Sequence, residues 1–467
     1  MAARCAFCPC AQDAPPAESS KRSSKAPEAQ LVRPLYTVIA YLLAPVVLAS
    51  LLWRGFRNRG YWRGLGERFG FLPAAPAGGA IWIHAVSVGE VQAARPLVRA
   101  LQDRFAHLRI LVTTVTPTGR ARAMAAFGEA VEHCYAPYDL PGVLKRFFDR
   151  KRPIAAIVME TELWPNLFHE CGKRRIPLVL ASARISPRSV KRYRRFLPLF
   201  RDALAHGIVI AAQSPRDAER FISLGANPQR TETVGNIKFD LELKGDGESP
   251  LTVLMPDART RPAWIAASTH QGEEEKVLKA QQTVIGTLPD ALLVLAPRHP
   301  ERFSAVAQRV ARSGLTYVRR SSGQPCVGDT QVFLLDTLGE LPDFFRAVDA
   351  AFVGGSLVPV GGHNLLEPAA AAIPVLSGPH YFNSPDIAEA LIREDAAAIV
   401  HDDRELAKRL LDFLQSESLC RQTGARARAV IDANRGTVER IVDLVTPLIE
   451  AKEKSSETNP PDRSSSG

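Results

Sequence analysis

Residues 80–105 read AIWIHAVSVGEVQAARPLVRALQDRF. The run Ala80–His84 is apolar at nearly every position, and a helix-like segment, Val91–Phe105, follows it after a short loop. A strand without polar alternation is typical of a parallel sheet that is buried on both faces. This stretch therefore predicts a strand–loop–helix unit of an α/β domain, whose loop lies at the sheet edge where ligands bind.

The same rhythm continues along the chain in two series. The strand-like runs of the first series are Ala80–His84, Arg109–Val115, Ile154–Met159, Pro177–Ser182 and Gly207–Ala212. Those of the second series are Trp264–Ala267, Ala291–Ala296, Thr316–Arg319, Val332–Leu335, Ala350–Val353, Pro374–Ser377 and Ala397–Val400. Strands that alternate twice over with helices predict two Rossmann-like, doubly wound domains that face each other across a cleft.

Changes in composition set the predicted domain boundaries. Residues 1–30 are rich in Ala, Pro and Ser and predict a disordered tail, as do the polar residues 452–467. The stretch 241–257 is polar, contains Gly and Pro, and predicts a linker. The N-terminal domain therefore covers residues 54–240, and the C-terminal domain covers residues 258–451.

A membrane-anchor helix is predicted over residues 31–53, before the first domain. Pro34 to Trp53 are twenty residues without a charge, and about 20 apolar residues span a bilayer as a helix. Four arginines follow between Arg54 and Arg63, and the positive-inside rule predicts that they and the globular part stay cytoplasmic. A helix lying in the membrane interface fits the same pattern, so spanning and interfacial anchoring both stay open.

The overall composition excludes several classes of protein. The 467 residues include 59 Lys+Arg against 49 Asp+Glu, a net charge of +10. A hydrophobic content of 46% excludes a wholly disordered chain, and seven Cys in this length exclude a disulfide scaffold.

One basic run stands out from this composition. Seven basic residues and no acidic one lie between Arg184 and Arg201. The run is either a solvated helix face or a surface that binds phosphates on nucleic acid or lipid. Because the chain lacks a nucleic-acid module and has an apolar span, anionic lipid is favoured.

Three loops of the first domain bring charged side chains to the ends of strand-like runs. HAVSVGE ends in Glu90, METELWPN contains Glu160 and Glu162, and GNIKFD places Lys238 beside the linker. A carboxylate in such a loop can act as a general base or hold a substrate hydroxyl. The alternative for the glutamates is helix capping, because an acidic residue in the first turn complements the helix dipole.

Three loops of the second domain have the character of an anion site. ASTHQGEEE (residues 267–275) combines hydroxyls with a helix start, and PRHP (residues 297–300) fixes Arg298 between prolines. GGSLVPVGGHNLLEP (residues 354–368) has four Gly in nine positions, which predicts that its backbone N–H groups approach a ligand closely. Its spacing is neither a dinucleotide fingerprint nor a Walker A loop. There is no Asp-x-Asp, and the ten His are dispersed, so no metal site is predicted.

Taken together, these strings resemble the family of 3-deoxy-D-manno-octulosonic acid (Kdo) transferases of Gram-negative lipopolysaccharide synthesis. The matching strings, in the family's order, are YLLAP…LLWRGFRN, RFG, HAVSVGE, METELWPN, ARISPRS, GNIKFD, ASTHQGEEE, LAPRHPERF, TLGEL and GGSLVPVGGHNLLEPAA. The resemblance implies a GT-B fold and an inverting transfer of Kdo from CMP-Kdo onto the lipid A precursor, lipid IVA, with release of CMP. It also implies an inner-membrane enzyme with its catalytic domains on the cytoplasmic side and no nucleic-acid partner.

The resemblance assigns roles to particular residues. Glu90 matches the general base, and Glu160 and Lys238 match positions of transition-state support. The segments that match CMP contacts are Pro297, Arg298, Leu338, Gly339, Glu340, Asn364, Leu365, Leu366 and Glu367. The basic residues assigned to the phosphates of the acceptor and to the anionic membrane surface are Arg184, Arg188 and Arg192. No metal cofactor is expected, because basic residues and helix N-termini can meet the leaving charge of a monophosphate donor. Ser182 departs from the family pattern, where Asn is expected.

Two other functions are compatible with parts of the sequence. One is a GT-B transferase that uses a UDP-sugar on a lipid, such as a relative of lipid A disaccharide synthase, which competition by CMP and by UDP would separate. The other is a non-catalytic basic protein at a membrane, against which the loops that contain Glu90 and Glu367 argue. No motif sets the number of Kdo units transferred.

Overall fold

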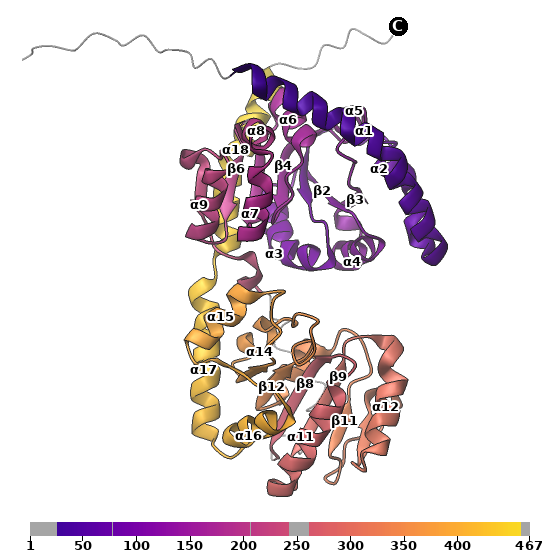
Figure 1. Cartoon of the computed structure of the whole chain (residues 1–467), viewed down its shortest axis with the longest axis vertical. Coiled ribbons are helices and arrows are strands. Elements are labelled where there is room, and N and C mark those ends of the chain that lie inside the picture. Colours follow the sequence, from indigo (N-terminus) through magenta and orange to yellow (C-terminus); the bar gives the residue numbers. More distant parts are fainter. Residues whose placement is uncertain (1–25, 77, 206, 242–260, 459–467) are drawn as a thin grey trace, which may run out of the picture.

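The computed structural model describes residues 26–458, apart from residues 77, 206 and 242–260 (Figure 1). The described chain forms two parallel β-sheets of seven strands each, packed between helices. This architecture confirms the predicted α/β fold of two doubly wound domains. The predicted N-terminal tail up to residue 25, the predicted linker from residue 242, and residues 459–467 lie outside the described residues.

The first sheet has the strand order β3-β2-β1-β4-β5-β6-β7. Its strands are β1 (Ala80–His84), β2 (Arg109–Thr114), β3 (Glu132–Tyr135), β4 (Pro153–Met159), β5 (Leu178–Ala183), β6 (Val209–Ala212) and β7 (Thr231–Thr233). Its helices are α2 (Leu65–Arg68), α3 (Val88–Arg104), α4 (Pro117–Phe127), α5 (Pro141–Lys151), α6 (Pro165–Lys173), α7 (Pro187–Arg194), α8 (Leu197–Ala205) and α9 (Pro215–Ser223). Side chains of β1 enter apolar clusters on both faces of the sheet, which explains why this strand lacks polar alternation.

The second sheet has the strand order β10-β11-β9-β8-β12-β13-β14. Its strands are β8 (Ala263–Thr269), β9 (Leu292–Pro297), β10 (Tyr317–Arg319), β11 (Val332–Leu334), β12 (Ala350–Val353), β13 (Val375–Ser377) and β14 (Ala397–Ile399). The helices that follow in this part of the chain are α11 (Glu274–Thr287), α12 (Phe303–Arg312), α13 (Leu341–Phe344), α14 (Leu366–Ala370), α15 (Pro385–Arg393), α16 (Asp403–Leu414) and α17 (Glu417–Asn434). Every predicted strand of the second series is present, with ends shifted by two residues or fewer.

Two strands of the first sheet, β3 and β7, were not predicted from the sequence. Both contain polar residues, with sequences EHCY and TET, and they lie at the two outer edges of the sheet. An edge strand pairs on one side only and does not need the continuous apolar run by which buried strands are recognised.

The C-terminal helix α18 (Thr437–Thr458) returns to the first domain (Figure 1). Ile441, Val445 and Ile449 are buried in an apolar cluster of the first sheet. The predicted second domain, which extended to residue 451, is therefore too long. The predicted tail from residue 452 is wrong for its first seven residues, because they continue this helix.

The N-terminal helix α1 (Ala26–Arg57) begins earlier and ends later than the predicted anchor helix. Its part from Val32 to Arg57 is long and apolar enough to cross a membrane, and an 18-residue stretch within it has a mean hydropathy of 2.2. The helix lies along the first domain (Figure 1), where the Tyr36 hydroxyl donates to the Asp139 carboxylate, 2.8 Å away. Its other face is open, since Leu42 is 72% exposed and Phe56 is 78% exposed.

Candidate active site

The topology of each sheet marks one place for a site. The chain crosses from one side of the sheet to the other between β1 and β4 in the first domain, and between β8 and β12 in the second. Ligands of doubly wound sheets bind beyond the carboxyl ends of the strands at this switch point. The loops after these four strands contain Glu90, Glu160, the ASTHQGEEE segment and the glycine-rich segment, so the topology supports the predicted location.

The two domains approach each other at this edge. The charge of Arg122, on α4 of the first domain, acts on the Glu367 carboxylate of the second domain. Arg122 itself is half-buried, and its Nε atom has no hydrogen-bond partner. Arg122 was not predicted from the sequence, because its effect on Glu367 depends on how the two domains meet.

Glu90 lies in the first turn of α3 and is half-buried. Its Oε2 atom accepts the N–H of Val86 at 2.7 Å, and its Oε1 atom accepts the Ser87 hydroxyl at 3.1 Å. Ser87 is the N-cap of α3 and accepts the Glu90 N–H in return. The capping interpretation of Glu90 is therefore confirmed, and it does not exclude a second role for the carboxylate.

The surroundings of Glu90 change its acidity. Burial raises the pKa of Glu90 to about 7, and the carboxylates of Glu160 and Glu162 add to the effect, while the Val86 and Ser87 bonds oppose it. A carboxyl with this pKa is a stronger base than an exposed one and still ionises near neutral pH. This combination suits general-base chemistry.

Glu160 and Lys238 form an ion pair beside Glu90. The Lys238 Nζ atom lies 2.7 Å from Glu160 Oε1, although the two residues are 78 positions apart in the chain. The Glu160 backbone is left-handed, with φ of 53°, directly after β4. Such a backbone is unfavourable for a non-glycine residue and clusters at functional sites. The structure thus brings all three residues with predicted catalytic roles to one region.

Glu162 and Trp164 complete this first-domain cluster. The Trp164 indole N–H donates to Glu162 Oε2 at 2.6 Å, and the Trp164 ring lies edge-on to the His84 ring. Burial lowers the pKa of His84 to about 4, so this imidazole is neutral at pH 7. His84 therefore adds no positive charge next to the carboxylates.

In the second domain the carboxylate of Glu273 is fully buried. Its Oε2 atom accepts N–H bonds from His270 and Gly355, and its Oε1 atom accepts them from Ser356 and Leu357, at 2.7 to 3.0 Å. The prediction that the N–H groups of the glycine-rich loop bind a ligand is therefore wrong for residues 355–357. The protein's own carboxylate occupies the concavity that these donors form.

A histidine pair joins the same two loops. The Nε2 atoms of His270 and His363 are 2.7 Å apart, and their ring planes are nearly parallel, with centroids 5.0 Å apart. Burial lowers the pKa of His363 to about 4, with the neighbouring His270 adding to the effect. At neutral pH one imidazole donates and the other accepts, which fastens the glycine-rich loop to the loop after β8.

The predicted donor-binding residues fall into two groups. Arg298 is exposed at the end of β9, and its charge acts on Glu367. The Asn364 amide donates to Glu367 Oε1 at 3.0 Å, so Arg298, Asn364 and Glu367 lie together. Pro297, Leu365 and Leu366 are buried, which leaves only their backbone to face a ligand.

The second group is the turn at residues 338–340. Leu338 is 70% exposed and Gly339 has a φ of 91°. Burial opposes ionisation of Glu340, but bonds from Thr337 and from Arg320, at 2.8 Å, lower its pKa below the usual range. This carboxylate is therefore ionised at neutral pH.

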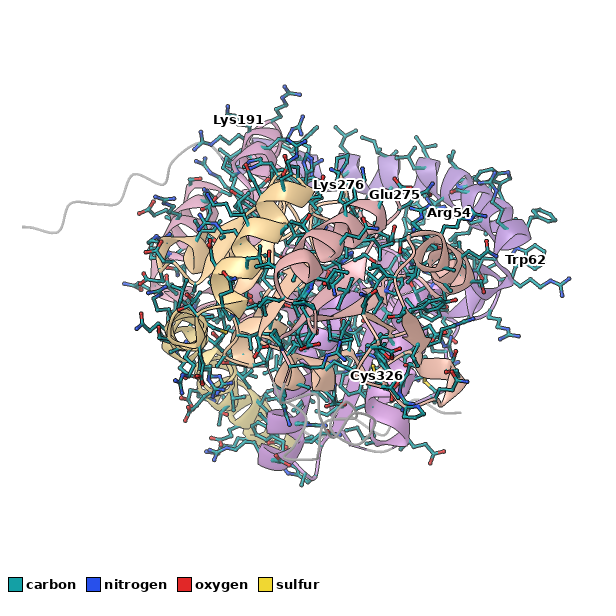
Figure 2. All side chains as sticks on the ribbon, turned by 90° about the horizontal axis from the view of Figure 1, so that it is seen from below. Arg54, Trp62, Lys191, Glu275, Lys276 and Cys326 are labelled. Atoms are coloured by element: carbon teal, nitrogen blue, oxygen red, sulfur yellow. The ribbon has the colours of Figure 1, made fainter. Side chains whose placement is uncertain are left out.

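The predicted phosphate-binding arginines, Arg184, Arg188 and Arg192, differ in exposure. Arg184 is half-buried, and its carbonyl accepts the Thr161 hydroxyl from the loop that contains Glu160. Arg188 and Arg192 are exposed on α7, as is Lys191, which projects from the outline of the molecule in Figure 2. The Arg184 backbone therefore lies directly beside the loop that contains Glu160.

Two residues of the site were missed or misread from the sequence. Ser182 appeared only as a departure from the family pattern, yet its buried hydroxyl accepts the Ile237 N–H at 3.2 Å. Glu273 stood out in the sequence only as part of a helix start within a possible anion site. Its three bonds to residues 355–357 join positions more than 80 residues apart, which no local pattern could reveal.

The chain is similar in sequence to known proteins over most of its length. Residues 63–241 match the family model described as 3-deoxy-D-manno-octulosonic-acid transferase (kdotransferase). The chain is 41% identical to a 3-deoxy-D-manno-octulosonic acid transferase of Haemophilus influenzae over 89% of this chain and 98% of that protein. It is 37% identical to the protein of the same name from Bordetella pertussis, over 88% of this chain and 98% of that one.

A solved structure shares the fold. A putative UDP-N-acetylglucosamine 2-epimerase from Listeria monocytogenes is 15% identical and covers 83% of this chain and 99% of its own, with a TM-score of 0.52. A likeness at this identity concerns the two-domain GT-B architecture alone.

Proposed function

The chain belongs to the 3-deoxy-D-manno-octulosonic acid transferase family, glycosyltransferases of lipopolysaccharide synthesis, and from this premise we propose that it transfers Kdo from CMP-Kdo to the phosphorylated lipid A precursor, lipid IVA. The observation that carries the proposal is Glu90. It is a carboxylate with a raised pKa at the switch point of the first sheet, beside a second carboxylate that is paired with Lys238.

Glu90 acts as the general base in this proposal. A carboxylate has about four acceptor positions, and Glu90 uses one on each oxygen for Val86 and Ser87. The remaining positions can accept the hydroxyl proton of the acceptor. As that proton moves to Glu90, the acceptor oxygen bonds to the anomeric carbon of Kdo, and the bond from that carbon to the phosphate oxygen of CMP breaks. One displacement without a covalent intermediate inverts the anomeric centre.

The residues at the end of the second sheet suit the donor. A guanidinium is a preferred partner of phosphate, and Arg298 is exposed beside Glu367. The Glu367 carboxylate, held by Asn364, has the acceptor capacity that two ribose hydroxyls require. Lys238 lies on the first-domain side, where its charge can offset the negative charge that develops as CMP leaves. We expect no metal to be required.

The open face of α1 and the basic face of α7 suit a lipid acceptor in a membrane. The apolar side chains of α1 are exposed, and the basic side chains Arg188 and Arg192 are exposed on α7. An apolar surface combined with basic residues favours an anionic membrane. We propose that the enzyme works at the cytoplasmic face of the inner membrane, and that Arg184, whose carbonyl bonds Thr161 in the loop of Glu160, helps to bind the acceptor.

The test is transfer from CMP-Kdo, generated in situ, onto tetraacylated lipid A precursor in detergent with EDTA present. The masses of the products count the Kdo units added. We expect product from the wild type and almost none from Glu90→Gln, with inhibition by added CMP and not by UDP.

Each other outcome contradicts a different part of the proposal. Wild-type transfer that EDTA abolishes would show that a metal is needed. Inhibition by UDP alone would favour a UDP-sugar donor, and CMP binding without product would mean that the acceptor is wrong.

A further inference from the structure

A single turn of 3-10 helix, η4 (Ile237–Phe239), packs into the cores of both domains. Ile237 is 2% exposed and belongs to an apolar cluster of the first sheet, together with Val234. Phe239, two residues later, is 5% exposed and belongs to a cluster of the second domain. The turn therefore joins the two cores within three residues.

Lys238 lies between these two buried side chains. Its amine extends to Glu160 Oε1, 2.7 Å away, in the proposed active site. Its backbone N–H donates to Asn236 Oδ1 at 3.0 Å, and the preceding N–H, of Ile237, donates to the Ser182 hydroxyl at 3.2 Å. The first domain thus fixes the N-terminal end of the turn.

The second domain fixes the other end of the turn through residues 364–367, the proposed donor-binding loop. The cluster that contains Phe239 also contains Leu365 and Leu366, the buried neighbours of Asn364 and Glu367. Since Leu365 and Leu366 are 4% and 1% exposed, their side chains are held in the same core as the Phe239 ring. A movement of this loop therefore acts on η4 through apolar packing.

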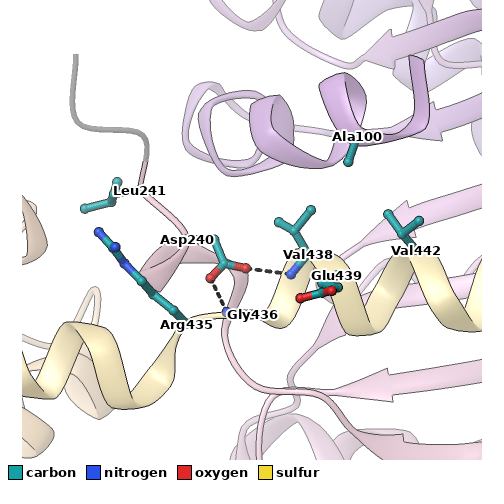
Figure 3. Close-up of a pocket in the computed structure, with 8 residues that line it drawn as sticks. All are labelled: Ala100, Asp240, Leu241, Arg435, Gly436, Val438, Glu439 and Val442. Carbon is teal, nitrogen blue, oxygen red and sulfur yellow. Dashed lines mark hydrogen bonds between the residues drawn. The ribbon is translucent and has the colours of Figure 1, made fainter. Parts of the chain in front are cut away.

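Asp240, the residue after the turn, is hydrogen-bonded to the segment between α17 and α18, where the chain returns to the first domain (Figure 3). Asp240 Oδ1 accepts the N–H of Gly436 at 2.7 Å, and Asp240 Oδ2 accepts the N–H of Val438 at 2.5 Å. Gly436 lies between α17 and α18, and its φ of 84° permits the turn from one helix to the other. Hence η4 is held by both domains and by the crossing that joins them.

We propose that Phe239 is a positioning residue, which sets the Lys238 amine against Glu160 in response to the seating of the donor-binding loop at residues 364–367. The proposal rests on the proposed transferase function for its kinetic effect. Phe239 does not touch the substrates. It acts through Lys238, whose charge is in place only when the second domain is packed against η4.

The kinetic test is a double-mutant cycle of Phe239→Ala with Lys238→Met. A displacement of about 1 Å at a reacting group can cost a factor of about 100 in rate. We expect Phe239→Ala to lower kcat by about 10- to 100-fold with little change in the KM for CMP-Kdo. In the Lys238→Met background the further loss should be below about 2-fold, because residues that act through one group are not additive.

Two further variants separate positioning from general destabilisation. Phe239→Leu keeps an apolar side chain against the second domain and should restore most of kcat. Phe413→Ala is the matched control, since Phe413 is an 8% exposed phenylalanine on α16 in another cluster of the same domain. It should lower thermal stability, as Phe239→Ala does, while kcat stays close to that of the wild type.

A crystal structure of Phe239→Ala tests the inference without any substrate. We expect the Lys238–Glu160 pair to be broken in the folded variant, with Nζ and Oε1 more than 4 Å apart. An intact pair, or equal kcat losses in both Lys238 backgrounds, would overturn the inference. If the pair is broken but the wild type transfers no Kdo, the proposed function fails and the positioning role stands. If Lys238→Met leaves kcat unchanged, both the role of Lys238 and the positioning of it are wrong.

Discussion

The first strands of the two domains along the chain, β1 and β8, are each followed by a glutamate at the start of the next helix, and the two glutamates differ in environment. Glu90, after β1, is half-buried and accepts one bond on each oxygen. Glu273, after β8, is fully buried and accepts two N–H bonds on each oxygen. Because a carboxylate has about four acceptor positions, Glu273 is saturated and Glu90 is not.

Glu273 and Glu90 therefore have different roles at equivalent positions of two similar domains. Glu273 is structural, and Glu90 is available for catalysis. Glu273 holds the glycine-rich loop in place, and no part of it is left for a ligand. Glu90 keeps acceptor positions open, and its burial among other carboxylates raises its pKa. What distinguishes them is the number of donors that the rest of the chain supplies, and not the residue type or the place in the topology.

The largest expected effect comes from replacing the unsaturated carboxylate. Glu90→Gln keeps an oxygen that can accept from Val86 or Ser87, so the cap of α3 should survive. Loss of a general base costs about 10²- to 10⁴-fold in rate. We expect single-turnover transfer to fall within this range while the unfolding temperature stays within about 2 °C of the wild type. A variant that keeps more than a tenth of the wild-type rate would show that Glu90 is only a cap.

The second largest expected effect is a loss of stability when Glu273, the carboxylate with four bonded N–H groups, is replaced. In Glu273→Gln, the amide NH2 group would face backbone N–H groups in a fully buried place, and two of the four N–H groups would lose their acceptor. Loss of a buried, charge-assisted acceptor costs about 3 kcal/mol. We expect this loss in chemical denaturation, together with weaker CMP binding because the glycine-rich loop is released.

The neighbouring residue Glu275 provides the control for this variant. Its side chain is 65% exposed, so Glu275→Gln should change stability by less than about 0.5 kcal/mol. Equal effects of the two substitutions would mean that the buried bonds of Glu273 contribute little, and the comparison with Glu90 would lose its basis.

The two strands and the position of Glu90 in a helix could be predicted from the sequence, but the contacts of Glu273 could not. The apolar runs predicted β1 and β8, and the motif HAVSVGE placed Glu90 in the first turn of a helix, where the structure has it. The same reasoning described residues 267–275 and 354–368 separately, one as hydroxyls and a helix start that suit an anion and the other as a loop that approaches a ligand. The Glu273 carboxylate joins these two segments by hydrogen bonds. A contact between residues more than 80 positions apart cannot be recognised from the spacing of residues in the sequence.

The return of α18 was missed for a related reason. Its apolar face is readable in the sequence, but the sheet that it covers is not. Ile441, Val445 and Ile449 cover the first domain because the chain crosses back at Gly436, where Asp240 caps the new helix. The cap comes from a residue almost 200 positions earlier.

The pH dependence of transfer sharpens the comparison further. Since burial raises the pKa of Glu90 to about 7, the proposed base is protonated at lower pH. We expect kcat/KM to fall about tenfold for each pH unit below this value, and to level off above it. Glu275→Gln should keep the same profile. An acidic limb close to 4.5, the ordinary value for Glu, would mean that Glu90 is not the group that limits the rate.

The smallest expected effect comes from Glu162. Its charge raises the pKa of Glu90, but less than that of Glu160 does. Glu162→Gln removes this charge and retains an oxygen that can accept the Trp164 N–H. The acidic limb of kcat/KM should therefore move to lower pH, by less than about one unit. Glu160→Gln should move it further in the same direction, because it also leaves the positive charge of Lys238 uncompensated. A limb that both variants leave in place would show that burial alone sets the pKa of Glu90, and that the first-domain cluster matters for position rather than for charge.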